Sequence, residues 1–468
     1  MLMWAQTKGS RWVFVVANVA AAFAIAGCDR VKAELLAPQN PGLVDPTAIN
    51  SPTAALALRV GALGQYKQLT NGNGGESIWQ YGGTLADEFK SADFANYRIG
   101  ADQRLTDPTI TWNYAGTTQA RGFIRDAIAA MKVYNPDSTA MLGELYAELA
   151  FFEMTMADNY CNGIPLGHTE NGVRVNGEPL TILQVYDSAA NHLDTAIALS
   201  ARSADSGSRS INRLSRVLKA RVLIDKDRSN AAAAAALVAG VPTDYVYDMT
   251  FSSASGANGM WTLNNSTARI SVADSFDVVG GVKNVIKNAL PFASANDPRV
   301  PVLNGDQANP RIVAEDQVTR PFYVSLIYRG QFDPLVLASG VDARLYEAEA
   351  KLQAGDIDGM VSILNALRQS KPAIGALGIP AMPALAAPAT TDGATSLLFR
   401  EKAFWTFGRG QRLPDLRRLI RQYGRPQDAV FPSGAYFKGG SYGSDVNFPI
   451  PSSEAVNPLF HGCLDRKA

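Results

Sequence analysis

Amphipathic helical segments that follow one another in pairs constrain this chain more than any other feature of its sequence. Within residues 181–199, apolar side chains recur at the spacing of one helix face, at Tyr186, Ala189, Ala190, Leu193, Ala196 and Ile197. An alanine-rich apolar segment at 141–157 precedes this helix, and the later pairs are 211–225 with 230–239, 341–352 with 360–367, and 396–407 with 413–423. A helix with one apolar side must bury that side on a neighbour. The sequence therefore predicts a mainly α fold built from packed helical pairs.

Such pairs resemble tetratricopeptide-like hairpins, and we expect them to form a right-handed superhelical scaffold. The pairs are unevenly spaced and long inserts separate them, so an irregular α domain without a repeat is the alternative. Residues 242–338 interrupt the helices and are rich in glycine, asparagine, serine, aromatic and β-branched residues. We expect this insert to form loops with short strands, and we expect the proline-containing residues 371–392 to form an irregular surface loop. Residues 51–468 are then a single domain.

The charge balance and the absence of catalytic motifs narrow the possible functions. Lys and Arg together number 43, as do Asp and Glu, so there is no basic surplus to bind the phosphates of nucleic acid. The histidines at 168, 192 and 461 form no HExxH motif and lie near no cysteine pair at zinc spacing, which argues against a metal site. No GxSxG motif, P-loop or dinucleotide-binding glycine motif in the right context is present. We expect a binding protein without a cofactor; a pair of glycoside-hydrolysing carboxylates is the enzymatic alternative.

The first residues of the chain have the features of a secretory signal. Lys8 and Arg11 precede an uncharged apolar run at 12–27, which ends in small residues before Cys28. The sequence Ile-Ala-Gly-Cys at this point resembles a bacterial lipoprotein lipobox. That resemblance implies a signal peptide at 1–27, diacylglycerol on the Cys28 sulfur, an acylated amino terminus and a lipidated tether at 28–50. The alternatives are a transmembrane anchor and a buried helix, and the run is shorter than the roughly 20 residues that a spanning helix needs.

Two cysteines remain once Cys28 is assigned to lipid. Cys161 and Cys463 form an even pair in a compartment where disulfides persist. The sequence predicts a disulfide between them, which would hold the C-terminal tail against the loop that follows the helix near residue 158. Two separate thiols are the alternative.

Several motifs resemble one family of proteins. The run REKAFWTFGRGQRLPDLRR at 400–418 resembles the "RE…GhRxxDLRR" signature of the SusD/RagB family of nutrient-binding lipoproteins. Residues 447–458 resemble the closing "PIPxxE…NP" stretch of that family, and residues 342–350 resemble its "AD…YAEA" helix. Residues 365–368 resemble the "lNxlR" that follows, and residues 297–299 match its "DPR". With the lipobox, these motifs cover most of the chain in the family's order.

The 400–418 signature has a structural interpretation before a functional one. Pro414 suits the first turn of a helix, and Asp415 lies where a negative charge favours the helix dipole. Glu401 and Arg412 could pair with each other. We expect the motif to maintain the scaffold and not to contact ligand. The aromatic residues at 404–407 depart from the family pattern, which indicates a divergent branch.

The resemblance also implies a function that depends on a partner. SusD-like lipoproteins act as lids over a SusC-like TonB-dependent transporter in the outer membrane, where they bind a glycan or, in some branches, a peptide. The resemblance therefore implies a lipid-anchored, surface-exposed protein that catalyses nothing. A protein-interaction scaffold or adhesin that takes no part in transport is one alternative. Asp29, directly after the lipobox, retains lipoproteins in the inner membrane of some bacteria, so that membrane is another.

Two regions combine aromatic side chains with amides and carboxylates, as sugar-binding surfaces do. One contains Trp79, Tyr81 and Tyr97, near Phe94 and several acidic residues. The other, within the insert, contains Trp261 and Asn264. Core packing is the alternative for each aromatic residue. Trp261 is the best candidate, since its neighbourhood is polar and rich in glycine.

Overall fold

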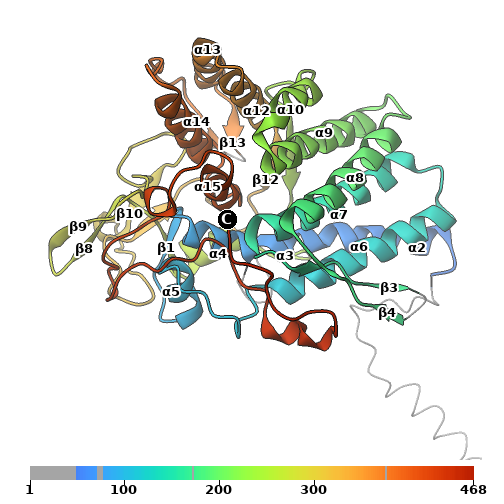
Figure 1. Cartoon of the computed structure of the whole chain (residues 1–468), viewed down its shortest axis with the longest axis horizontal. Helices are drawn as coiled ribbons and strands as arrows, with labels where there is room; N and C mark the ends of the chain where they lie inside the picture. The colour runs from blue at the N-terminus through green and yellow to red at the C-terminus, as the bar shows by residue number, and fades with distance from the viewer. Residues whose placement is uncertain (1–48, 71–76, 171–172, 375–376) are drawn as a thin grey trace, which may run out of the picture. The chain divides into compact units, whose positions relative to one another are not determined.

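The helical pairs predicted from the apolar spacing are present, and the fold is mainly α (Figure 1). They are α7 (Thr139–Asn159) with α8 (Ile182–Ser200), α9 (Ser206–Lys226) with α10 (Ala231–Val238), α12 (Gly340–Gln353) with α13 (Ile357–Gln369), and α14 (Thr391–Trp405) with α15 (Arg412–Arg421). Successive pairs also contact each other, α8 against α9 and α10 against α12. This arrangement is the scaffold of stacked hairpins that the sequence predicted.

The computed structural model describes residues 49–468 except 71–76, 171–172 and 375–376. Residues Ser51–Ala468 form one compact unit. The predicted signal peptide at 1–27, the lipidation site Cys28 and nearly all of the tether at 28–50 lie outside the described residues. Within the part of the chain that the structure describes, no helix has both the length and the apolar character needed to cross a membrane.

Local sequence signals set the ends of these helices. Thr181 and Gln184 form a capping box at the start of α8: the Thr181 hydroxyl accepts from the Gln184 N–H at 3.3 Å, and the Gln184 side chain accepts from the Thr181 N–H at 2.8 Å. Gly355 ends α12 with φ of 76°, a backbone conformation that suits glycine. Asp356 then caps α13 by accepting from the Gly359 N–H at 2.8 Å.

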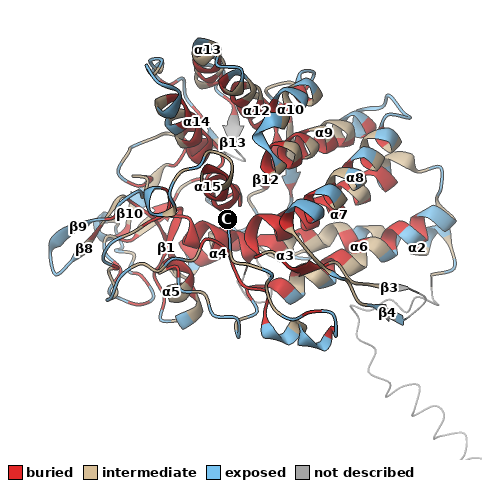
Figure 2. Cartoon of the chain, viewed as in Figure 1, coloured by how far each residue is buried: buried red, intermediate tan, exposed pale blue. Residues whose placement is uncertain are grey.

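The N-terminal part of the unit supplies further helices, of which one is buried throughout. α2 (Pro52–Leu63) begins after the N-cap Ser51 and packs against α6 (Tyr114–Tyr134). The other elements are η2 (Gly64–Tyr66), α3 (Lys67–Thr70), α4 (Ile78–Leu85) and α5 (Asn96–Asp102). Every residue of α4 is buried (Figure 2). A helix enclosed on all sides has no polar face, so its sequence lacks the periodicity by which the other helices are recognised.

The predicted insert at 242–338 is present as loops with short strands. Its first strand, β6 (Val246–Met249), pairs antiparallel with its last, β12 (Leu335–Ser339), so the insert leaves and rejoins the scaffold at one place. The elements between them are α11 (Gly259–Trp261), the π-helical η4 (Thr262–Ser266), β7 (Ile270–Val272), β8 (Phe276–Val279), β9 (Val282–Val285), β10 (Val302–Asn304), η5 (Gly305–Gln307) and β11 (Tyr323–Ser325). β7 pairs with β1 (Phe89–Ser91), which ties the insert to the segment after α4.

Short elements complete the chain. They are β2 (Ile164–Pro165) paired with β5 (Pro179–Leu180), β3 (His168–Glu170) paired with β4 (Val173–Val175), β13 (Ala373–Ile374) paired with β14 (Leu377–Gly378), and the turns η3 (Arg228–Asn230), η6 (Gln427–Ala429) and η7 (Ser452–Val456). The predicted irregular loop at 371–392 thus contains the β13–β14 pair and the start of α14, and its described residues are otherwise irregular.

Residues of the family-like motifs meet in the interior through ion pairs. Glu401 on α14 accepts from Arg299 at 2.7 and 3.1 Å and from Arg368 at 2.9 Å, and both Glu401 and Arg299 are buried. The expected pair between Glu401 and Arg412 is wrong: Arg412 instead donates to Asp87 at 3.0 Å. Glu401 lies on α14 and Arg412 begins α15, and each side chain pairs with a residue from another part of the chain. These contacts join three motifs that are far apart in the sequence.

A second group of buried charges lies between α12 and α15. Glu349 on α12 pairs with Arg418, and the Lys402 ammonium lies 3.3 Å from Glu349 and 2.6 Å from Asp415. Burial alone would raise the pKa of Glu349, but Arg418 and Lys402 outweigh it and lower the pKa to about 2. The signature residues therefore hold helices together, which is the structural role that we expected of them.

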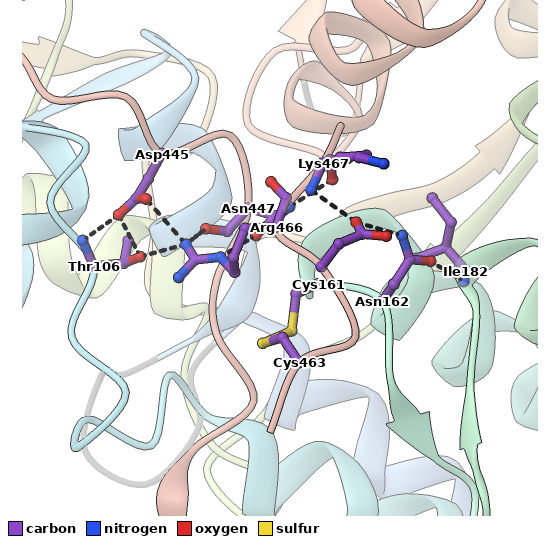
Figure 3. Close-up of a disulfide and its surroundings, with 10 residues drawn as sticks. Thr106, Cys161, Asn162, Ile182, Asp445, Asn447, Cys463, Arg466 and Lys467 are labelled. Carbon is purple, nitrogen blue, oxygen red and sulfur yellow. Dashed lines mark hydrogen bonds and ion pairs between the residues drawn. A yellow bond between two sulfur atoms is a disulfide. The ribbon is translucent and has the colours of Figure 1, made fainter. Parts of the chain in front are cut away.

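The predicted disulfide joins Cys161, just after α7, to Cys463 in the C-terminal tail (Figure 3). Polar contacts continue on both sides of it. The Asn162 amide donates to Asp465 at 2.9 Å, and Arg466 donates to the Asn447 side chain at 2.6 Å and to the Thr106 hydroxyl at 2.8 Å. The tail is thus fastened to the helical scaffold and to the loop after α5.

Candidate functional site

Two of the predicted ligand-binding aromatics belong to the core. Trp79 and Tyr81, both on α4, are each 2% exposed. The Trp79 ring packs 6.0 Å from that of Phe151, and the Tyr81 ring lies 5.3 Å from that of Trp112. Their placement does not support a role in ligand binding, because a side chain enclosed by protein cannot stack on a sugar.

Asn264 also has a structural role, in the insert. It is 1% exposed, and its amide donates to the carbonyls of Ile270 at 2.7 Å and Tyr323 at 3.1 Å. Its carbonyl accepts from the Ser325 N–H at 2.6 Å. These bonds fasten η4 to β7 and β11, so the side chain is not available to a ligand.

The other two predicted residues remain partly exposed. Tyr97 on α5 lies 6.2 Å from Tyr81 between ring centroids, with the Arg98 guanidinium 5.0 Å from its ring. Trp261, at the end of α11, is also partly exposed. Their role in ligand binding stays a prediction, and neither lines the hollow described next.

A hollow of about 390 Å³ lies where four loop segments meet. Its lining comes from the β1–α5 connection and α5 itself, the β8–β9 hairpin, the loop before β11 and a C-terminal loop: Asp93, Phe94, Ile99, Val278, Val279, Gly280, Asp316, Val318, Phe437 and Lys438. Phe94 is 66% exposed and Val318 is 64% exposed. Large apolar side chains held this open to water, around a concave surface, mark a binding site more often than a defect in packing.

Lys438 and Asp316 form the polar side of this hollow. The Lys438 ammonium lies 2.7 Å from the Asp316 carboxylate and donates to the Asp93 carbonyl at 2.9 Å. Burial alone would raise the pKa of Asp316, but hydrogen bonds from Lys438 and Thr319 outweigh it and hold that pKa below its usual value. The carboxylate is therefore charged at neutral pH, and an ammonium with three donors has one left for a ligand hydroxyl.

The two phenylalanines are positioned by neighbouring polar contacts. The Asp93 carboxylate accepts from the Ala95 N–H at 3.1 Å and pairs with Arg98, which fixes the turn that carries Phe94. Beside Phe437, the Tyr436 hydroxyl donates to Asp102 at 2.9 Å. Burial raises the pKa of Asp102 to about 7. Residues next to Phe94 and Phe437 are therefore held in place by hydrogen bonds and an ion pair.

This arrangement is suited to binding. Apolar and aromatic walls can cover the C–H faces of a sugar ring or an apolar side chain, and the charged groups at one side can bond to hydroxyls or amides. Among the described residues, no group of His, Cys, Asp or Glu is arranged to hold a metal ion.

The sequence pointed to only one wall of this hollow. Phe94 and Asp93 fall within the aromatic region that it singled out, whereas Asp316, Val318, Phe437 and Lys438 were missed. One signal was present: residues 434–443, GAYFKGGSYG, alternate glycines with aromatic residues as loop-borne binding surfaces do. Asp316 and Val318 carried no such signal, because only tertiary structure brings their loop to this place.

This chain is a protein of stacked helical hairpins whose candidate binding surface is formed by loops. No protein-family model and no curated protein matches this sequence. Solved structures do match: a SusD superfamily protein from Bacteroides vulgatus ATCC 8482 has a TM-score of 0.60 at 14% identity, over 89% of this chain and 99% of its own. A SusD-like protein from Bacteroides fragilis NCTC 9343 has a TM-score of 0.60 at 15% identity, over 90% and 98%.

A laminarin-binding SusD-like protein gives a TM-score of 0.59 at 15% identity, over 89% of this chain and 99% of its own. This protein therefore has the SusD fold. The resemblance drawn from the sequence motifs is confirmed at the level of the fold.

Proposed function

We propose that this chain is a surface nutrient-binding lipoprotein of the SusD/RagB family, which captures an oligosaccharide and delivers it to a SusC-like TonB-dependent transporter. The observation that carries the proposal is the hollow walled by Phe94 and Phe437, set on a SusD fold. The motifs at 297–299, 342–350 and 400–418 add support, since they were drawn from the sequence independently of the fold. Solved structures with this fold include one described as laminarin-binding and one described as a SusD-like carbohydrate-binding protein.

Binding of an oligosaccharide at this hollow depends on Phe94. Replacing Phe94 by alanine removes the most exposed aromatic wall, and we expect affinity to fall by roughly ten- to thirtyfold, as for a central aromatic contact. A panel of glycans that includes laminarin, with peptides alongside, measures this by titration calorimetry on the purified protein. Phe332→Ala is the matched control, since Phe332 is 41% exposed but lies outside the hollow.

Three results would contradict this assignment. Unchanged glycan affinity in Phe94→Ala, with unfolding like that of the wild type, would move the site elsewhere. Loss of binding in Trp261→Ala with unchanged melting would move it to the partly exposed Trp261. Binding of peptides but of no glycan would favour the peptide-binding alternative within the same family.

The lipid anchor is the second part of the proposal. Cys28→Ser removes the acyl acceptor, and each buried methylene contributes about 0.8 kcal/mol to membrane binding, so we expect the protein to leave the membrane fraction. Fractionation with labelled palmitate measures this, and antibody access to intact cells tests surface exposure in the outer membrane. Cys463→Ser is the control, because it replaces a cysteine that is not part of the lipobox motif. A Cys28→Ser protein that stays in the membrane and still incorporates palmitate would refute the assignment.

The neighbouring genes distinguish a transport role from a role as a scaffold or adhesin. A gene for a TonB-dependent channel beside the gene for this protein favours delivery to that channel. Absence of such a neighbour favours a scaffold or adhesin that binds only other proteins.

A further inference from the structure

A second hollow, of about 280 Å³, lies on the helical scaffold between the end of α8, α9 and the end of α10. It shares no lining residue with the hollow at Phe94. Arg209, Arg213 and Arg216, which lie on one side of α9 at helical spacing, all line it. Three of the residues that line this one small hollow therefore carry a guanidinium group.

The rest of α9 shows what is unusual about these arginines. Lys219 pairs with Asp194, Arg221 with Asp158, and Lys226 with Asp187. No ion pair to a carboxylate is formed by Arg209, Arg213 or Arg216 within the described part of the chain. The cations at the C-terminal end of α9 are thus neutralised by the protein, and those near its N-terminal end are not.

The sequence of α8 explains the difference. Asp187 and Asp194 lie two helical turns apart, and each holds a lysine of α9. Two turns further along the chain, the position that would continue this row of acids is Ala201, which lines the hollow. The row of ion pairs between α8 and α9 therefore ends where the hollow begins, and the negative charge that would complete it is absent from α8.

Contacts of the arginines hold them in place without neutralising them. The Arg216 Nε donates to the Asn212 side chain at 2.8 Å, and Asn212 in turn donates to the Ser200 hydroxyl at 3.1 Å. The Arg213 guanidinium lies 5.8 Å from the Tyr245 ring, and Arg209 donates to the Ala204 carbonyl. Each guanidinium carries five N–H donors, so most of these donors remain for a ligand.

We propose that this hollow binds a small oxyanion, a carboxylate, sulfate or phosphate group, by ion pairs with Arg209, Arg213 and Arg216. The guanidinium group matches the geometry of such oxyanions and binds them with two hydrogen bonds at once. A hollow of about 280 Å³ accommodates one inorganic anion or one acidic sugar unit, and not a helix or strand of another protein. The ligand is therefore a small molecule that carries the charge missing from α8.

The test is titration calorimetry of the purified protein with inorganic phosphate, sulfate or D-glucuronate at an ionic strength kept constant with chloride. We expect saturable binding of at least one of these probes. The double variant Arg213→Gln/Arg216→Gln should weaken it by at least about tenfold, as loss of charged hydrogen bonds does. Preference for phosphate and sulfate, or for glucuronate, identifies the oxyanion.

The control removes the same charge from the same helix. Lys219→Gln/Lys226→Gln also lowers the charge of α9 by two, but these lysines lie outside the hollow, so anion affinity should change by no more than about twofold. Phe94→Ala should leave anion binding unchanged. If the double variant fails to fold, Arg209→Gln provides a second test, since Arg209 is exposed. It should weaken anion binding by about threefold or more.

Some outcomes would overturn the proposal. Wild-type protein that binds none of the three anions would do so, as would equal losses of affinity in the two double variants. Binding of polyglutamate without binding of any small anion would also overturn it, because that result would identify a docking surface for an acidic polypeptide.

Discussion

Replacing Glu401 by glutamine should lower the free energy of unfolding by about 3–5 kcal/mol, since it breaks a buried ion pair from one side. Glu401 is fully buried and accepts from both Arg299 and Arg368. The amide of glutamine would turn an N–H group toward guanidinium N–H donors and remove the charge that Glu401 shares with Arg368 and Arg299, leaving Arg299 with Asp297 at 2.6 Å as its carboxylate partner. Denaturant unfolding followed by circular dichroism measures the change.

Glu347→Gln supplies the matched control for this experiment. Glu347 lies on α12 and pairs with Arg344 at 2.7 Å, but both side chains are about one-fifth exposed. We expect that substitution to cost no more than about 1 kcal/mol, as for ion pairs in contact with water. Equal effects of the two substitutions would contradict the view that the motif residues hold the core together through buried charge.

Replacing Cys463 by serine should lower the free energy of unfolding by about 2–5 kcal/mol. The disulfide to Cys161 spans 302 residues, so its loss releases a large part of the unfolded chain from constraint. It should also loosen the tail, because the contacts of Asp465 and Arg466 then have no covalent support. Unfolding with and without reductant, together with hydrogen exchange over residues 461–468, measures both effects.

The disulfide also predicts how the stabilities of the cysteine variants compare with one another. Cys161→Ser should destabilise the protein to the same degree, and the double variant should be no less stable than either single one, because all three lack the same bond. Reductant should lower the stability of the wild type and leave the variants unchanged. Additive losses in the double variant would show that each sulfur contributes through its own packing and not through the bond.

Sequence reasoning was strongest where a single helix carries the signal. The apolar stripe of α8 depends on neighbours within a few residues, so the sequence predicts it directly. It failed for α4, whose residues are all buried, and there the aromatic rings of Trp79 and Tyr81, close to amides and carboxylates in the sequence, had suggested a ligand surface. Burial on every side is a property of the assembled fold, and no local pattern reports it.

The amino-acid sequence by itself determined the helical pairs, the insert at 242–338, the cysteines able to form a disulfide and the motifs that predicted a SusD fold. Tertiary structure decided which charges pair, since Glu401 reaches Arg299 and Arg368 from other motifs and Arg412 reaches Asp87. Tertiary structure also determined which residues line each of the two hollows. Phe94 and Phe437 line one hollow because segments distant in the chain are packed together, and Ala201 and Arg213 line the other because α8 and α9 pack against each other. Helix periodicity depends on contacts within a few residues, whereas a binding site depends on the spatial arrangement of loops and helix ends.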